Sequence, residues 1–308
     1  MGVTKMAEAR GKLLLLGEHA AVYGHPAVGL SLPWTLKVGF SAAPTWQLPG
    51  LGTREAAVRA LLERFQDLAA EEGLPRPLPG RLEFTTDIPP ESGFGSSGAL
   101  CAALVDLFFP GLPMADKDRL AWRAEGLFHG TPSGIDTALA FRRGWWALDP
   151  STRPVTARAL PDPSLVLVAG SLVRTTDTKT LVGDLARRRA EGEKLVVETL
   201  ELLGATSARA ITLLEEGRSS ELPPLINQAR EGLRTLGLET PGLSSVLKAG
   251  LASPGALAGK LSGAGGGGAF FVVFTHLDAA QAALPRLEAA ISPEHWTAPP
   301  RVVQTQGE

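Results

Sequence analysis

The sequence has only one cysteine and one asparagine, and it has no long hydrophobic run. The single cysteine, Cys101, has no partner for an internal disulfide, so an oxidising compartment is not required. The longest apolar runs, such as residues 13–16 and 269–274, are far shorter than the roughly 20 residues that span a bilayer. No apolar stretch that ends in a small-residue cleavage site follows the N-terminal charges. We therefore expect a cytoplasmic globular protein without a membrane partner.

The sequence also lacks an excess of charge of either sign. Its 30 lysines and arginines face 32 aspartates and glutamates, for a net charge of -2 and an isoelectric point near 6.3. This balance provides no broad basic surface that could neutralise a phosphate backbone. We therefore expect no nucleic-acid partner.

Several common motifs of nucleotide-binding and hydrolytic enzymes are missing. There is no G-x-x-x-x-G-K-[ST] loop, because the Gly-Lys pairs at residues 11–12 and 259–260 both precede leucine. The H-R-D and D-F-G elements of protein kinases are absent, as are H-E-x-x-H and the G-x-S-x-G nucleophile elbow. The motifs therefore do not support a P-loop enzyme, a protein kinase or a zinc hydrolase.

The 308 residues are 44% hydrophobic and 20% charged, which is ordinary for a folded protein and long enough for two modest domains. Strand patterns cover residues 12–16, 28–40 with a break at Pro33, 81–88, 144–148, 165–169 and 269–274. Helical patterns cover residues 54–72, 96–109, 116–128, three stretches within 180–236, 243–251 and 278–290. Because strands and helices mix without strict alternation, we predict an α+β fold. The proline-rich stretch 150–163 favours two domains, over residues 1–160 and 161–308.

A glycine-rich segment, residues 93–98, fits G-x-G-x-x-G between a strand pattern and a helical pattern. The strand before it is half polar and is separated from the glycines by Pro89 and Pro90, which argues against a Rossmann fingerprint. Glycines let the backbone approach phosphate oxygens, and Ser96 and Ser97 lie where the N–H groups of a helix N-terminus bind an anion. The alternative is a serine-capped helix after a flexible turn. The segment alone leaves both interpretations open.

A second cluster, residues 260–268, includes five glycines among its last six residues and leads directly into a strand. Restraining so many glycines on folding has a high entropic cost, and a simple turn does not need them. We expect this backbone to approach a ligand or another loop closely. The alternative is a tight turn between two strands.

Three acidic residues and one histidine are candidates for chemistry. Glu18 and His19 follow an apolar strand, where active-site groups are common, although a hydrogen-bonded structural cluster would have the same pattern. Asp136 closes a polar loop and could be a helix cap or a carboxylate beside a reacting hydroxyl. Glu125 lies on a largely apolar helix face and needs a lysine, an arginine or a metal as a partner, because an unpaired buried carboxylate is costly.

The order of these segments resembles the GHMP small-molecule kinases. The resemblance rests on Lys-x₅-Glu-His-x₃-Tyr-Gly over residues 12–24, Gly-Phe-Gly-Ser-Ser over 93–97, His-Gly-x-Pro-Ser-Gly-x-Asp over 129–136 and the glycine cluster 260–268. It covers the chain from about residue 11 to 275, and residues 172–179 are similar to the segment that covers the substrate in this family. The first and third segments are most similar to the branch of the family that phosphorylates mevalonate.

The resemblance implies a two-domain α+β fold, with an N-terminal domain like domain 2 of ribosomal protein S5 and a ferredoxin-like C-terminal domain. It implies ATP- and Mg²⁺-dependent phosphorylation of the 5-hydroxyl of mevalonate, with mevalonate as the small-molecule partner. The alternatives are another acceptor of the same family (phosphomevalonate, homoserine or a sugar) and a catalytically silent relative that binds a nucleotide or metabolite. A homodimer is left open.

The resemblance also implies a role for particular residues. The triphosphate would be wrapped by Pro90, Gly93, Phe94, Gly95, Ser96, Ser97 and Gly98, and Mg²⁺ would be held by Ser97 and Glu125. Asp136 would take or orient the hydroxyl proton, and Lys12 would lie beside it and stabilise its charged form. The acceptor would be contacted by Glu18, His19, Ser133 and Thr176. These roles fit phosphoryl transfer, which needs mostly positioning and charge neutralisation.

The sequence departs from the usual family pattern at two points. Glu91 stands where small residues are usual, and a carboxylate close to phosphates would be repelled unless it points outward. Gly98 stands where alanine is usual, which weakens the start of the helix by up to about 1 kcal/mol.

Overall fold

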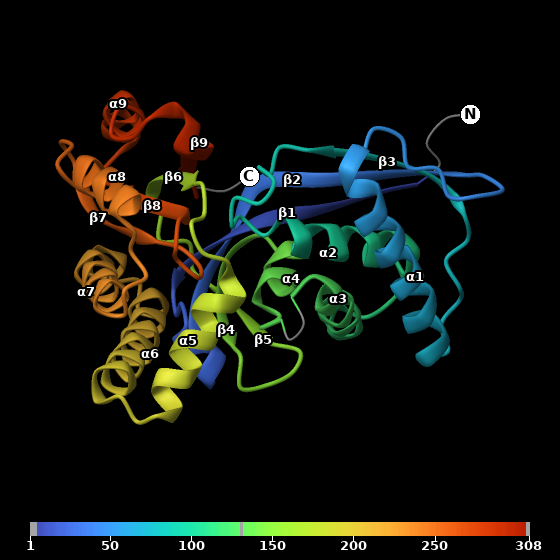
Figure 1. The fold of residues 1–308 in the computed structure, drawn as a ribbon, viewed down its shortest axis with the longest axis horizontal. Helices are drawn as coiled ribbons and strands as arrows, with labels where there is room; N and C mark the ends of the chain where they lie inside the picture. The colour runs from blue at the N-terminus through green and yellow to red at the C-terminus, as the bar shows by residue number, and fades with distance from the viewer. Residues whose placement is uncertain (1–4, 130–131, 306–308) are drawn as a thin grey trace.

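The computed structural model describes residues 5–129 and 132–305. In this part of the chain the strands form two antiparallel sheets, which lie one after the other along the long axis of the molecule (Figure 1). Helices pack on each sheet, and the predicted α+β fold class is confirmed. Strands of the first sheet end at Leu160 and those of the second begin at Val166. The division into domains at residue 160 stays a prediction.

The first sheet is built around one long strand, β2. Its order is β1-β2-β4-β5, with β3 also paired to β2. The strands are β1 (Lys5–Leu16), β2 (Ala27–Ala42), β3 (Gly80–Thr86), β4 (Gly144–Asp149) and β5 (Thr156–Leu160). All pairings in this sheet are antiparallel, which agrees with the argument against a parallel Rossmann sheet.

The predicted break at Pro33 is wrong, because β2 runs through this residue. β2 pairs with β4 over residues 27–31 and with β3 over residues 36–42, so Pro33 lies where the strand changes partner. On the opposite side, the register with β1 shifts between Arg10 and Lys12. Proline has no N–H group to donate, and at this junction the ladder does not require one.

Helices α1 (Glu55–Glu71), α2 (Ser96–Phe108), α3 (Met114–His129) and α4 (Ile135–Ala140) accompany the first sheet. The short 3₁₀ helices η1 (Ala20–Tyr23) and η2 (Gly52–Arg54) precede β2 and α1 respectively. The apolar stripe predicted on α1, including Leu61 and Phe65, is buried except at Ala57. Helix α2 packs against β1 and β2 and is buried over most of its length, so it forms the centre of this half. This packing fixes the N-terminus of α2 beside β1.

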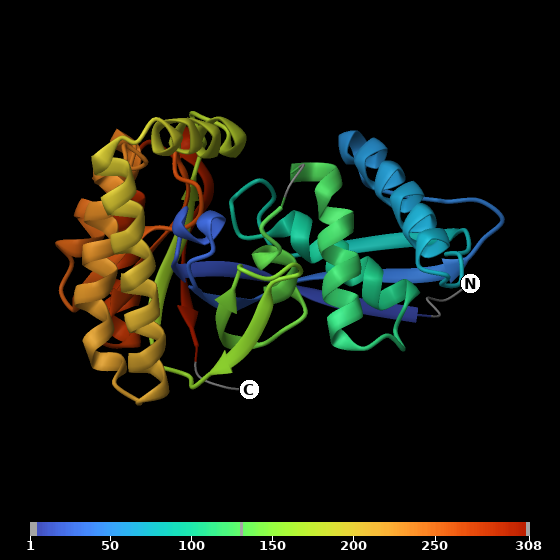
Figure 2. The same ribbon diagram turned by 90° about the horizontal axis from the view of Figure 1, so that it is seen from below.

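The second sheet has the order β7-β8-β6-β9. Its strands are β6 (Val166–Leu172), β7 (Ala256–Leu261), β8 (Gly268–Phe274) and β9 (Trp296–Gln304). Its helical segments are α5 (Thr178–Ala190), α6 (Lys194–Glu215), η3 (Ser219–Glu221), α7 (Leu222–Thr235), α8 (Pro241–Leu251), α9 (Leu277–Glu288) and η4 (Pro293–His295). Helices α7, α8 and α9 pack on this sheet, and α6 packs against α7 and contacts β1 and β2 of the first sheet (Figure 2).

The sequence patterns missed helix α4 and strands β5, β7 and β9. Strand β9 contains Pro299 and Pro300, which argue against a strand, yet it pairs only with β6 and so lies at an edge of the sheet, where prolines are tolerated. Strand β7 merges into the glycine cluster, which hides its apolar pattern. Across the described residues, no helix is both long and apolar enough to cross a membrane.

Candidate active site

The end of β1, the glycine-rich loop and the start of α4 meet at one place. The backbone N–H of Lys12 donates to the carbonyl of Phe94 at 2.8 Å, which joins the loop to the edge of β1. The Lys12 side chain is buried, and its Nζ lies 3.2 Å from Oδ1 of Asp136. The Asp136 side chain keeps 28% of its surface exposed. A buried cation therefore supports a carboxylate that a small molecule can reach.

The glycine-rich loop is shaped by close approach to Lys12. Gly95 has φ 78°, and a Cβ at this position would lie 2.7 Å from Cγ of Lys12. Gly95 also occupies the N-cap position of α2, where it provides no side-chain cap. The serine-capped helix is therefore not the arrangement found. The N-terminus of α2 instead lies against Lys12, and the N–H groups of a first helical turn are suited to bind an anion.

Glu125, on α3, is a buried acid without a complete set of partners. Within the described residues its Oε2 has no hydrogen-bond partner. Burial raises the pKa of this carboxyl well above its usual range, Asp136 adds to the rise, and Lys12 opposes it. Burial and the charge of Glu125 also raise the pKa of the Cys101 thiol, which places Glu125 against α2. Helix α3, which carries Glu125, packs along α2, where Ser97 lies one helical turn before Cys101.

Asp136 is held in place by the packing of α4 against α2. Gly134, with φ 85°, occupies the N-cap position of α4, so Asp136 is not the cap. Ser133 Oγ accepts a hydrogen bond from the N–H of Ile135 at 3.3 Å. A Cβ on Gly98 would lie 2.9 Å from both the carbonyl carbon and the Cβ of Asp136. Gly98 on α2 therefore packs directly against Asp136, and there is no room for a side chain between them. Gly130 and Thr131 of the same motif lie outside the described residues.

Glu18 and His19 form a turn after β1 that is held by the second half of the chain. Glu18 Oε1 accepts a short hydrogen bond from Nζ of Lys260, and both side chains are fully buried. His19 has φ 59° and its Nε2 lies 2.9 Å from the carbonyl oxygen of Ala264. Burial lowers the pKa of the His19 imidazole, which favours the neutral ring donating Nε2–H to Ala264. Both side chains therefore carry structural contacts at this turn.

Comparison with known proteins shows where this site belongs. The sequence model of the GHMP kinases N terminal domain matches residues 54–144, and that of the GHMP kinases C terminal domain matches residues 210–292. The mevalonate kinase of Aeropyrum pernix is 30% identical over 294 residues, covering 87% of this chain and 88% of the relative. The chain belongs to the GHMP kinase family. The resemblance inferred from the four motifs is confirmed, and with it an ATP-dependent kinase activity.

Solved structures have the same fold as this GHMP kinase. The L. major mevalonate kinase in complex with R-mevalonate superimposes with a TM-score of 0.80 and 22% identity, covering 99% of this chain and 97% of the other. The Streptococcus pneumoniae phosphomevalonate kinase gives a TM-score of 0.73 and 16% identity over 94% and 97% of the two chains. At these identities the likeness shows the two-domain fold and does not select an acceptor.

One charged residue of this GHMP kinase was not among the residues assigned from the motifs. The Arg174 guanidinium lies between the two glycine clusters, 3.0 Å from where a Cβ would stand on Gly93 and 3.0 Å from the same point on Gly268. Burial lowers the pKa of Arg174, and the charge of Asp136 opposes this. Its Nη1 donates to Thr178 at 2.5 Å. Its place in residues 172–179 made it a candidate contact for a carboxylate of the acceptor, and the structure brings its guanidinium to the two glycine clusters.

The second glycine cluster of this GHMP kinase, residues 260–268, lies in close contact with other segments of the chain, in agreement with the expected close approach of its backbone to another loop. It connects β7 to β8, and added side chains would collide with Leu238 at Gly265 and with Leu181 at Gly266. The N–H of Thr175 donates to the carbonyl of Gly266 at 2.8 Å, so the chain around Thr176 is fastened to this cluster. The glycines allow two backbones to lie in direct contact.

Glu91, one of the two positions that depart from the family pattern, lies at the surface. Glu91 is exposed with φ 56°, and Pro90 beside it is exposed as well. Ser92 between Glu91 and Gly93 is buried, and its Oγ donates to the carbonyl of Pro89 at 2.6 Å. The Glu91 side chain is therefore exposed to solvent and is not packed inside the loop.

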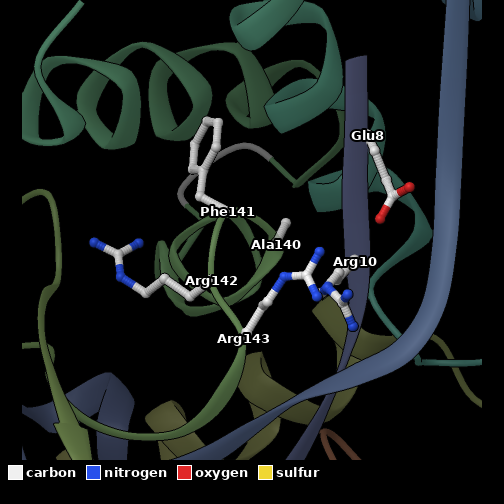
Figure 3. Close-up of a pocket in the computed structure, with 6 residues that line it drawn as sticks. All are labelled: Glu8, Arg10, Ala140, Phe141, Arg142 and Arg143. Atoms are coloured by element: carbon white, nitrogen blue, oxygen red, sulfur yellow. The ribbon is translucent and has the colours of Figure 1, made fainter. Parts of the chain in front are cut away.

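A cavity of about 300 Å³ lies outside this group of residues, lined by Glu8, Arg10, Ala140, Phe141, Arg142 and Arg143 (Figure 3). Two guanidinium nitrogens of Arg142 donate to the carboxylate of Asp118, at 2.7 and 2.5 Å. The lining contains none of the residues assigned from the motifs.

Proposed function

We propose that this kinase transfers the γ-phosphoryl group of ATP to the 5-hydroxyl of mevalonate and releases ADP and 5-phosphomevalonate. The observation that carries the proposal is the Lys12–Asp136 pair beside the N-terminus of α2. The A. pernix relative named mevalonate kinase and the L. major enzyme that binds R-mevalonate support this acceptor. The residues that conduct the chemistry come from β1, α2, α3 and α4.

Asp136 is the group that receives the hydroxyl proton. The acceptor oxygen forms a bond to the γ-phosphorus while the bond from that phosphorus to the β,γ-bridging oxygen breaks, and ADP carries away the electron pair. The O–H proton passes to the Asp136 carboxylate. Lys12, 3.2 Å from Oδ1, holds the carboxylate in position and stabilises negative charge on the acceptor oxygen as it develops.

The phosphates lie along the glycine-rich loop in this proposal. The backbone of residues 93–98 approaches them without side chains in the way, and the N-terminal end of α2 favours their negative charge. Arg174, placed between Gly93 and Gly268, adds a cation on the opposite side of the loop. Positioning and charge neutralisation of this kind supply most of the catalysis of phosphoryl transfer.

Ser97 and Glu125 would hold Mg²⁺. A buried carboxylate that binds a cation has an unpaired oxygen and a raised pKa when the cation is left out. Glu125 shows both features at its Oε2 and its carboxyl group, so the residues fit the ion. The described residues contain no cluster of three or more acidic, histidine or cysteine ligands, which suits an ion that takes most of its ligands from phosphates and water. When bound, Mg²⁺ neutralises charge on the phosphate oxygens.

The acceptor would lie between the Glu18–His19 turn and the segment around Thr176. Ser133 would support Asp136 through its hydrogen bond to the N–H of the neighbouring Ile135. Lys12 and Lys260 are each paired with a carboxylate, so they offer little to a second phosphate group on the acceptor. Phosphate recognition normally uses clusters of arginine or lysine. The charges at this site therefore favour mevalonate over 5-phosphomevalonate.

A coupled assay of ADP release with mevalonate, 5-phosphomevalonate, homoserine and galactose tests the proposal. We expect kcat/KM at saturating MgATP to be highest for mevalonate, by at least about 100-fold, because the extra charge of the phosphorylated acceptor has no matching cation. Preference for 5-phosphomevalonate, or comparable efficiency with homoserine or galactose, would refute the mevalonate assignment but not the kinase chemistry. Binding of ATP without turnover of any acceptor would indicate a silent relative.

A further inference from the structure

Lys260 is the most completely buried cation that the proposed chemistry does not use. It stands near the end of β7 in the second sheet, while its partner Glu18 follows β1 of the first, 242 residues away in sequence. Both side chains have 0% exposure. Nζ of Lys260 also donates to the carbonyl of Leu261 at 2.7 Å and lies 5.1 Å from the centre of the Phe271 ring.

A pair buried this deeply contributes little net stability. Removing two charges from water is costly, and the attraction between them commonly offsets only that cost. Burial accordingly lowers the pKa of Lys260, and Glu18 acts in the opposite direction. An apolar pair of similar volume would hold the two halves together as well. A buried ion pair differs from an apolar contact in that it accepts only one geometry.

Two neutral hydrogen-bonding contacts from the next residues hold the same turn. Ser262 Oγ donates to the carbonyl of Leu14 at 3.0 Å and accepts from its N–H at 2.9 Å, so one side chain satisfies both backbone groups at the edge of β1. Ala264 accepts the Nε2–H of His19 at 2.9 Å. Residues 260–264 therefore fasten the chain from Leu14 to His19 at three points.

The turn that is fastened has little freedom to adjust. His19 has φ 59°, a left-handed conformation that persists in a non-glycine residue only when its surroundings enforce it. Gly17 has φ 107°, and a Cβ there would collide with Ala27 at 2.5 Å. A displacement of Lys260 would thus be transmitted to the turn rather than absorbed by it.

The loop that begins at Lys260 also reaches the phosphate side of the site. Its glycines Gly267 and Gly268 pack on Arg174, whose guanidinium in turn lies beside Gly93. One short loop therefore touches the Glu18–His19 turn at one end and the Arg174 contacts at the other. Lys260 lies at the end of the loop that contacts the turn, whereas the Arg174 contacts lie at Gly267 and Gly268, so loss of the Lys260 charge acts on the turn.

We propose that Lys260 is a positioning residue for the acceptor alcohol. Its ion pair with Glu18 holds the Glu18–His19 turn against the loop 260–268. This inference rests on the proposed function, because it places the acceptor at that turn. Lys260 touches neither the phosphates nor the acceptor. Its loss should affect the binding of one substrate and leave the other unchanged.

The experiment compares steady-state kinetics of the wild type with Lys260→Met, which keeps the length and apolar stem but removes the charge. We expect KM for mevalonate to rise on the order of tenfold, the scale at which loss of a supporting partner is felt at other sites. KM for ATP and kcat should stay within about twofold, since the phosphate loop and Asp136 are untouched. Lys248→Met, an exposed lysine on α8, is the matched control and should behave as wild type.

Ser262→Ala provides the second variant, because it removes both hydrogen bonds to Leu14 and leaves every charge in place. We expect Ser262→Ala to raise KM for mevalonate and to leave KM for ATP nearly unchanged. This variant keeps the proposal testable if Lys260→Met does not fold. Unchanged KM for mevalonate in the variant that folds, or equal changes in both KM values and kcat, would overturn the positioning role. Absence of mevalonate phosphorylation in the wild type would instead overturn the proposed function, so the two failures are distinguishable.

Discussion

Replacing Gly98 by alanine tests whether the packing of α2 on α4 sets the position of the carboxylate. The backbone of Gly98 is helical, so alanine has no conformational penalty there and gains up to about 1 kcal/mol of helix propensity. Its Cβ, however, would lie 2.9 Å from both the carbonyl carbon and the Cβ of Asp136. Since carbon atoms make ordinary contacts at about 3.5–4.0 Å, the two helices must separate by roughly 0.6 Å or more.

A displacement of this size acts directly on the reacting geometry. A misplacement of about 1 Å can cost about 100-fold in rate, so we expect Gly98→Ala to lower kcat by roughly 10- to 100-fold. Overpacking costs about 1–3 kcal/mol, which the helix propensity partly offsets, so the free energy of unfolding should fall by about 2 kcal/mol or less. KM for ATP should change little, because the Cβ points at Asp136 rather than at the phosphates.

The assay is single-turnover phosphorylation of mevalonate, which isolates chemistry from product release, with thermal unfolding measured on the same samples. Gly183→Ala is the matched control, because Gly183 lies in α5 with nothing within 4 Å of an added Cβ. The control should be slightly stabilised and fully active. A Gly98→Ala variant with the wild-type rate constant would show that α2 and α4 do not determine where the Asp136 carboxylate lies.

Three further predictions concern the charged groups. Asp136→Asn should bind ATP normally and lose about 10²- to 10⁴-fold in kcat, measured by coupled assay and nucleotide titration, because the proton acceptor is removed while the shape is kept; wild-type turnover in the pure variant would contradict the assignment. Glu125→Gln should raise the Mg²⁺ concentration for half-maximal rate by roughly tenfold or more, and a magnesium titration that superimposes on wild type would place the metal site elsewhere. The same variant should stabilise the protein free of metal and nucleotide: burial, then Asp136, raise the pKa of Glu125 above 4.5, so wild-type stability is complete below pH 4.5 and is lost as pH rises through the higher folded-state pKa. Urea unfolding from pH 4 to 8 should thus show a difference that grows with pH to about 1–3 kcal/mol, and a constant difference would contradict this reasoning.

Features whose physical cause is local could be predicted from the sequence alone. The stripe of apolar residues on α1 and the buried run of β8 follow from side-chain periodicity, which is a property of neighbouring residues. The glycines at 93 and 95 are required by left-handed backbone angles, so the loop before α2 could be recognised in advance. The order of four motifs was enough to identify the family, because each motif keeps its chemistry within a few residues.

Only the tertiary structure decided how these segments meet. Pro33 continues a strand because β2 changes partner there, and β9 accepts two prolines because it lies at a sheet edge. Gly98 depends on Asp136, and Glu18 on Lys260, across 38 and 242 residues of sequence. Such pairs leave no periodicity or spacing in the sequence, since contact, burial and charge between distant residues exist only after the chain has folded.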